Sequence, residues 1–237
     1  MDPNSVKDFD VGKFLGSLES YARDAKFDYA YYLVTHELRR MGLHEKIGKL
    51  QPEHMNPILL FLRDWMPAGW VGWSEKGSRR WKMDSELCRV LNELKDEFIS
   101  LSSLNLQQFT FEQNGNAIKK IFDRISKLRF GVSEEAISTV TSKIMHLLNP
   151  RLFVMWDTRI INFYDREPNA DGYVEFMEKM KERAARLQPY LGRIMEKTEE
   201  LRVEAGAVYG MEICVGKTLA KLIDENNWIE SRKRKYS

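Results

Sequence analysis

Apolar residues recur at helical spacing along most of the chain, and this spacing limits the folds that the sequence can adopt. The clearest stripes are Leu87, Leu91, Leu94, Phe98 and Leu101; Ile118, Ile121, Phe122, Ile125 and Leu128; Ile137, Val140, Ile144 and Leu148; and Met211, Val215, Leu219 and Leu222. Steps of three and four residues place each set on one face of a helix, which must be buried against a neighbour. We therefore predict an all-α, multi-helix globular fold, with two helical lobes around a cleft.

Proline marks the boundaries between several of these helices. Asn149-Pro150 is expected to end one helix, because proline disfavours the helical conformation in the residue before it. The segment 171–204 is expected to form either one long helix or two shorter helices, with Pro189 as the possible point of division. Trp70–Trp81 is the one segment whose pattern is compatible with a strand.

The chain is expected to fold as one globular unit over residues 1–230. Its 43% hydrophobic and 11% aromatic content are ample for a core, and no low-complexity linker interrupts it. Two lobes are compatible with the pattern, one formed by 1–83 with 206–230 and the other by 84–205. Residues 231–237 form a basic tail outside the unit.

Composition restricts the partners and the compartment. The chain has 37 Lys and Arg against 35 Asp and Glu, so its net charge of +2 neither requires nor excludes a nucleic-acid partner. Its two cysteines and four histidines lack metal-ligand spacing, which predicts no metal site and no cofactor. No apolar run is long enough for a membrane span, and the first residues do not resemble a secretory signal. These features favour a cytoplasmic protein with no membrane association.

A glycine turn lies between two of the helical stripes, at Phe130-Gly131-Val132-Ser133. A glycine turn that opens a helix leaves backbone N–H groups pointing outward, and such groups hold a DNA phosphate without contacting a base. Gly131 and Ser133 are therefore candidate phosphate-binding positions. The alternative is a simple corner between two helices.

Asp157 directly precedes the apolar helical residues Ile160 and Ile161, which makes it a natural N-cap. One interpretation is that its carboxylate only satisfies the exposed amides of the helix. The other is that the same carboxylate stands beside a cleft, where it stabilises a cationic sugar or orients water.

Together, the glycine turn and the aspartate resemble the helix-hairpin-helix DNA glycosylase superfamily. The family pattern is Leu-Pro-Gly-Val-Gly-x-Lys-Thr-Ala, then a helix, then Val-Asp-Thr-His-Val. Residues 130–136 of this chain stand against the first part, and Trp156-Asp157-Thr158-Arg159-Ile160 against the second. The stretches Thr139–Ile144 and Asp157–Ile161 look most like the archaeal 8-oxoguanine DNA glycosylase branch. The resemblance covers roughly Ile125 to Tyr164, and it implies double-stranded DNA as partner and Asp157 as the catalytic residue.

The chain departs from the family at two positions. Ser133 replaces the second hairpin glycine, and Glu135 stands where bifunctional members have their Schiff-base lysine. The resemblance therefore implies a monofunctional hydrolase without lyase activity. Lys143 lies about 80° around and about 12 Å along the helix from Glu135, so it does not simply replace that lysine. It is expected to contact a phosphate or to pair with an acidic neighbour.

An enzyme of this kind also needs an aromatic base pocket and phosphate contacts. Trp156, next to Asp157, is the best candidate for the pocket. The candidate phosphate contacts are Lys143, Arg159, Lys76, Arg79, Arg80 and Lys82. The last four are interleaved with tryptophans in a loop that contains Gly and Ser, and a solvated loop is the alternative.

Three functions remain open at this point. The first is a monofunctional base-excision glycosylase. The second is a non-catalytic helical protein on a similar scaffold that binds nucleic acid or another protein. The third is an unrelated helical interaction protein. Gly216-Lys217-Thr218 does not indicate a nucleotide-binding loop, because the glycine spacing is wrong by one residue.

Overall fold

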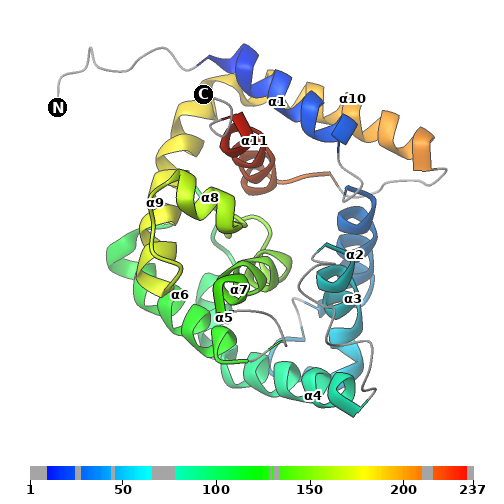
Figure 1. Cartoon of the computed structure of the whole chain (residues 1–237), viewed down its shortest axis with the longest axis vertical. Helices are drawn as coiled ribbons and strands as arrows, with labels where there is room; N and C mark the ends of the chain where they lie inside the picture. The colour runs from blue at the N-terminus through cyan, green and yellow to red at the C-terminus, as the bar shows by residue number, and fades with distance from the viewer. Residues whose placement is uncertain are drawn as a thin grey trace.

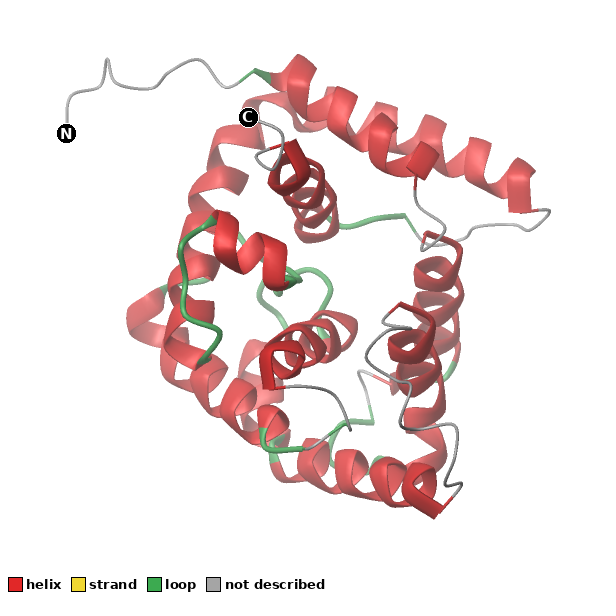
Figure 2. Ribbon diagram, in the orientation of Figure 1, coloured by secondary structure: helices red, strands yellow, loops and turns green. Residues whose placement is uncertain are grey.

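The structure is a computed structural model of the chain, and it describes residues 10–24, 28–43, 46–65, 78–128, 130, 134–209 and 216–233. Every regular element within these ranges is a helix (Figures 1 and 2). In chain order they are α1 (Val11–Asp24), α2 (Asp28–Arg40), the 3-10 helix η3 (Pro52–Met55), α3 (Asn56–Trp65), α4 (Ser78–Glu93), α5 (Lys95–Leu101), α6 (Phe111–Ser126), α7 (Glu134–Leu148), α8 (Thr158–Phe163), α9 (Ala170–Leu187), the 3-10 helix η5 (Gln188–Tyr190), α10 (Leu191–Tyr209) and α11 (Leu219–Lys233). The fold class is all-α, as predicted.

The predicted helix boundaries agree with the structure at both prolines. α7 ends at Leu148, just before Asn149-Pro150, and Pro189 lies in η5 between α9 and α10. The stripe that begins at Leu87 is divided between α4 and α5, because the chain turns at Leu94 (φ −89°, ψ 14°). The proposed strand over Trp70–Trp81 is wrong at its end, since α4 begins at Ser78; residues 70–77 lie outside the described ranges.

A single cluster of buried side chains extends from Phe14 in α1 to Ile223 in α11. Its members come from both of the lobes suggested by the sequence, so the described parts of the two segments share one core. α7 lies in the middle of the ring of helices, with α6 and α9 on one side and α2 and α3 on the other (Figure 1). From Ser138 to Leu148 every residue of α7 is buried, the polar ones included.

The two ends of the described chain meet, because α11 packs against α1. Residues 231–233, which were expected to belong to a basic tail, form the last turn of α11, and residues 234–237 lie outside the described ranges. α11 is unusual in composition: Lys221, Asp224, Glu225, Asn226 and Asn227 are all buried in it. Burying so many polar groups is costly unless each finds partners.

The described residues contain neither a membrane-spanning helix nor a cluster of metal ligands. No helix there combines the length and the apolar composition that crossing a bilayer requires. In the same ranges, no three His, Cys, Asp or Glu side chains are grouped as metal ligands would be.

Candidate functional site

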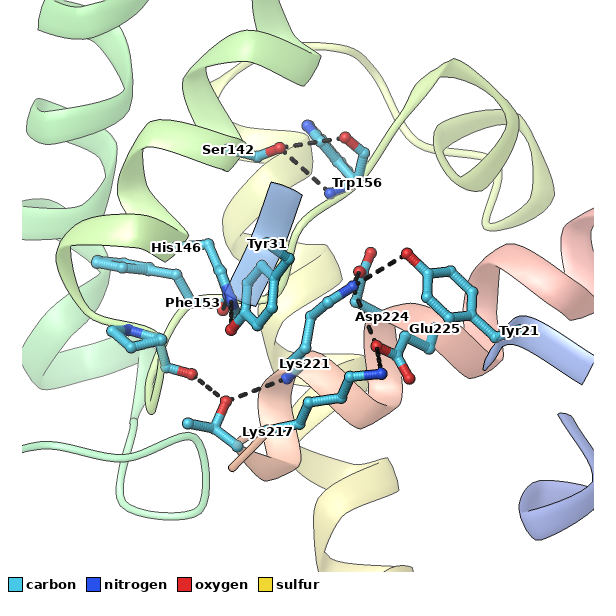
Figure 3. A network of polar contacts seen from close by, with 12 residues as sticks. Tyr21, Tyr31, Ser142, His146, Phe153, Trp156, Lys217, Lys221, Asp224 and Glu225 are labelled. Carbon is cyan, nitrogen blue, oxygen red and sulfur yellow. Dashed lines mark hydrogen bonds and ion pairs between the residues drawn. The ribbon is translucent and has the colours of Figure 1, made fainter. Parts of the chain in front are cut away.

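The segment between α7 and α8 is fastened to α7 by hydrogen bonds from buried polar side chains (Figure 3). Trp156 N donates to Ser142 Oγ (3.2 Å), and His146 Nδ1 lies 2.6 Å from the Phe153 carbonyl oxygen. The Asn149 side chain donates to the Leu101 carbonyl (2.9 Å) and holds the end of α7. Because these bonds fix the backbone up to Trp156, they also fix the position of the residue that follows.

Asp157 is the N-cap of α8, as the sequence predicts. Its backbone is extended (φ −124°, ψ 175°), and Oδ1 accepts a hydrogen bond from Ile160 N at 2.9 Å. The side chain is half-buried and lines a pocket. The capping interpretation is therefore correct, and the position beside a pocket that the functional interpretation requires is present as well.

This pocket lies where α1, α3, α7 and α11 meet the N-terminus of α8, and its volume is about 90 Å³. Such a volume holds several water molecules. It is lined by Tyr21, Trp65, Lys143, Met155, Trp156, Asp157, Ile160, Asp224 and Trp228. Four aromatic residues and three charged ones thus line one opening, a combination typical of ligand sites. We call it the Asp157 pocket.

Lys143 extends from α7 into the Asp157 pocket. Its side chain is nearly buried, and its ammonium lies 5.0 Å from the ring centroid of Trp65. Burial lowers the pKa of Lys143 to about 8, although the Asp157 and Asp224 carboxylates act in the opposite direction. The predicted contact with a backbone phosphate would need an exposed amine, whereas Lys143 is buried and lines the pocket. The expected acidic neighbours are present.

Asp224 supplies the second carboxylate of the pocket. It comes from α11, and Lys221 Nζ lies 2.9 Å from its Oδ2. Burial raises the pKa of Asp224, while Lys221 is the strongest influence that lowers it; Asp157 raises it further and Lys143 lowers it. The two carboxylates and Lys143 therefore interact electrostatically across one small opening.

Trp156 is one of the residues that line the pocket, but its side chain is almost completely buried. Its side chain is 1% exposed, and its Nε1 donates to the Ser138 carbonyl at 3.2 Å. The indole packs 5.0 Å from the Tyr173 ring and 5.3 Å from the Phe176 ring, between centroids. These contacts hold the ring in the core, so Trp65 and Trp228, which are only partly buried, offer the pocket more exposed aromatic surface than Trp156 does.

The predicted phosphate contacts are only partly within the described residues. Arg159 is exposed on the first turn of α8, two residues after Asp157. Gly131, Ser133 and Lys76 lie outside the described ranges. Arg79, Arg80 and Lys82 lie in the first turns of α4, but their side chains are not among those described.

The largest group that sequence reasoning missed is a buried ionic network on α11. Lys217, which precedes the helix, pairs with Glu225 (2.9 Å), and Lys221 contacts both Asp224 (2.9 Å) and Glu225 (3.4 Å). Thr218 Oγ1 accepts a hydrogen bond from Lys221 N (3.3 Å) at the start of the helix. Gly216-Lys217-Thr218 therefore leads directly into α11 and is not a nucleotide-binding loop, and its lysine pairs with Glu225. The available signal was spacing: residues 221, 224, 225 and 228 fall on one face of α11, and Lys217 lies four residues before Lys221.

Comparison with known proteins gives no match to a family model, to a curated protein or to a solved structure. Function must therefore be inferred from the Asp157 pocket and the residues that surround it.

Proposed function

We propose that the protein is a DNA-binding protein of the helix-hairpin-helix glycosylase type, and a monofunctional enzyme that hydrolyses the bond between a base and its sugar. The observation that carries this proposal is the combination of a helix-capping carboxylate with aromatic walls in one pocket. Asp157 is the carboxylate, and Tyr21, Trp65 and Trp228 are the walls. The resemblance of residues 125–164 to the glycosylase superfamily agrees with this arrangement.

Asp157 is suited to the role of a charge-stabilising carboxylate. When an N-glycosidic bond breaks, the base leaves with the bonding electrons and positive charge builds on the sugar. A carboxylate held in a fixed position lowers the energy of that state, because it does not have to reorganise during the reaction. Asp157 is held by Ile160 N through Oδ1 and is one of the residues that line the pocket. Water then adds to the sugar carbon and loses a proton, while the departing base gains one.

The aromatic walls are suited to an everted base. A base must leave the duplex before an enzyme reaches its glycosidic bond, and stacking on aromatic rings offsets part of that cost. Trp65 and Trp228 both line the pocket, and they come from two different helices, α3 and α11. Arg159, exposed two residues after Asp157, is a candidate contact for a flanking phosphate.

Lys143 is assigned to contact with the base. Its pKa of about 8 leaves it mostly protonated at neutral pH, so it can donate a hydrogen bond or a proton to a departing base. Covalent attack would instead need the neutral amine. This assignment keeps the enzyme monofunctional even though an amine lies in the pocket.

The proposal is tested by incubating the protein with a panel of lesion-bearing duplexes and measuring released base and abasic sites. Wild type should release the damaged base from at least one duplex. Asp157→Asn should bind that duplex but release no base from it. Borohydride is added in parallel, because it traps a covalent adduct between a lysine and the DNA. An adduct that forms with wild type but not with Lys143→Gln would show that the enzyme uses lyase chemistry instead of hydrolysis. Salt-dependent duplex binding with no base release from any member would instead favour the non-catalytic alternative.

A further inference from the structure

Lys221 is enclosed by groups from α1, α2, α3 and α11, of which Tyr21, Tyr31 and Asp224 are seen in Figure 3. Its side chain is fully buried on α11, and Nζ lies 2.9 Å from Asp224 Oδ2. The Tyr21 hydroxyl is 3.4 Å from the same nitrogen. The ring centroids of Tyr21, Tyr31 and Trp65 lie 4.8, 5.0 and 5.0 Å away, and they come from α1, α2 and α3.

A lysine buried to this degree needs compensation for the water it loses. Aromatic ring faces supply part of it and a carboxylate supplies more, since both attract an ammonium group. Two of the enclosing residues, Tyr21 and Trp65, also line the Asp157 pocket, as does Asp224. Lys221 does not line the pocket, yet it contacts three of the side chains that do.

We propose that Lys221 is a positioning residue for the Asp157 pocket, which holds Asp224 as an ionised hydrogen-bond acceptor aimed at the N–H donors of a bound ligand. This role deepens the proposed function, because it concerns the ligand-contacting wall of the same site. It does not depend on catalysis. A carboxylate accepts hydrogen bonds and does not donate them, so the ligand edge that faces Asp224 must carry donors.

The charges around Lys221 explain why Asp224 depends on it. Lys217 is paired with Glu225, 2.9 Å away, and so is committed elsewhere in the network. On the pocket side, Lys143 lowers the pKa of Asp224 less than Lys221 does, and Asp157 raises it. His146 on α7 is neutral at pH 7, because burial lowers its pKa to about 3. Removing the Lys221 ammonium therefore leaves Asp224 buried without its strongest counter-charge.

The ionisation of Asp224 is measured by ¹³C NMR of its side-chain carboxyl across pH in the free protein. We expect the pKa of Asp224 to rise by at least one unit in Lys221→Met and to return toward the wild-type value in Lys221→Arg. Lys217→Met is the matched control, since it removes a buried ammonium that pairs with Glu225, and it should move the pKa of Asp224 much less. The proposal is overturned if the pKa of Asp224 is unchanged in Lys221→Met, or if it shifts equally in Lys221→Met and Lys217→Met.

A second measurement keeps the test independent of whether Lys221→Met folds. In the nearly isosteric Asp224→Asn variant, the ¹⁵N signal of the Lys221 ammonium is followed across pH. The pKa of Lys221 should fall by at least one unit relative to wild type, because its main carboxylate has been neutralised. A Lys221 signal that titrates as in wild type would show that the pair is not coupled, and would exclude the positioning role.

The ligand preference is tested with two small planar probes and no DNA. 2-Aminobenzimidazole has adjacent N–H donors, and 2-methylbenzoxazole has a similar ring without any. Binding is followed by tryptophan fluorescence at pH 7, and we expect the donor-bearing probe to bind at least tenfold more tightly. This preference should disappear in Asp224→Asn and weaken in Lys221→Met. Equal affinities, a preference unchanged in both variants, or no binding of either probe overturns the assignment, whereas failure of base release alone contradicts only the proposed function.

Discussion

Asp157 Oδ1 accepts a hydrogen bond from Ile160 N at 2.9 Å, while the same side chain lines the pocket. One carboxylate therefore has a structural contact and faces a potential ligand. Asparagine caps a helix about as well as aspartate does, because it keeps the accepting oxygen. Asparagine carries no negative charge, so substitution at this position separates the two roles.

Asp157→Asn is predicted to abolish most base release while leaving stability almost unchanged. The cap survives, so the free energy of unfolding should change by less than about 0.5 kcal/mol. Loss of a group that stabilises transition-state charge lowers the rate by roughly 10²–10³-fold. Urea unfolding and single-turnover base release measure the two effects on the same preparation.

Asn169 provides the control, because it caps α9 in the same way, with Oδ1 accepting from Gly172 N at 2.9 Å. Asn169→Ala should cost about 1 kcal/mol of stability. It should leave base release unchanged, because Asn169 does not line the Asp157 pocket. Full activity in Asp157→Asn would show that the carboxylate is only a cap.

Trp228→Leu is predicted to weaken binding to a duplex that contains an unpaired base. Loss of one stacking contact costs about 1–3 kcal/mol, which corresponds to roughly 5- to 150-fold in affinity. The slope of affinity against salt should not change, because the substitution removes no charge. Fluorescence anisotropy at several salt concentrations measures both quantities.

Trp156 gives the contrasting case for tryptophan. Its ring is packed against Phe176 and Tyr173 in the core, so Trp156→Leu should lower stability by several kcal/mol, in the range of about 3–5 for a large core truncation. For Trp228 itself, equal affinity of wild type and Trp228→Leu for the duplex with an unpaired base would show that Trp228 does not contact the base.

The sequence predicts the helices well because their signals are local. Apolar spacing identifies α6 and α7, Pro189 identifies the break before α10, and the position of Asp157 before Ile160 identifies the cap of α8. Each of these depends on residues that are neighbours in the chain. The burial of Trp156 could not be predicted, because adjacency to Asp157 does not show which way a ring points, and only the packing against Tyr173 and Phe176 decides that.

The contribution of α11 to the pocket could not be predicted, because it depends on residues that are far apart in the sequence. Lys221 and Tyr21 are 200 residues apart in the sequence, and no local pattern indicates that they meet. Charged residues on a terminal helix ordinarily face solvent. Lys221 and Glu225 are buried here because α11 packs between α1 and α9, so their partners come from the tertiary fold.

Lys217→Met is predicted to destabilise the protein by about 3–5 kcal/mol, because it leaves the Glu225 carboxylate buried with a weaker partner. Lys217 Nζ lies 2.9 Å from Glu225 Oε1, and both side chains are almost completely buried. Adding Glu225→Gln to Lys217→Met should recover part of the loss. Urea unfolding measures all three proteins.

The exposed ion pair of Arg40 with Glu37, 2.9 Å apart, is the matched control. Arg40→Met should cost less than about 1 kcal/mol, since solvent screens that pair. If Lys217→Met were no more destabilising than Arg40→Met, the buried pair would contribute nothing to the fold and α11 would have to be held by its apolar contacts alone.

His146 is predicted to make stability depend on pH on the acid side of neutrality. Burial lowers its pKa from the ordinary 6.5 to about 3 in the folded state. Between these two values the unfolded chain binds a proton that the folded chain does not, so protonation favours unfolding. The free energy of unfolding should therefore fall as pH drops from 6.5 toward 3, with a slope from this residue of about 1.4 kcal/mol per pH unit.

His146→Gln isolates this contribution, because glutamine can accept from the Tyr31 hydroxyl and donate to the Phe153 carbonyl as the neutral imidazole does. Those contacts measure 3.0 and 2.6 Å. The variant should lose the slope assigned to His146, so its stability relative to wild type should rise steadily from pH 6.5 to 4. His36→Gln makes the same replacement at a more exposed histidine and is the control for the substitution itself. Parallel curves for wild type and His146→Gln would mean that the imidazole becomes charged without unfolding, in which case the polar contacts between α2 and α7 must open to water in the folded protein.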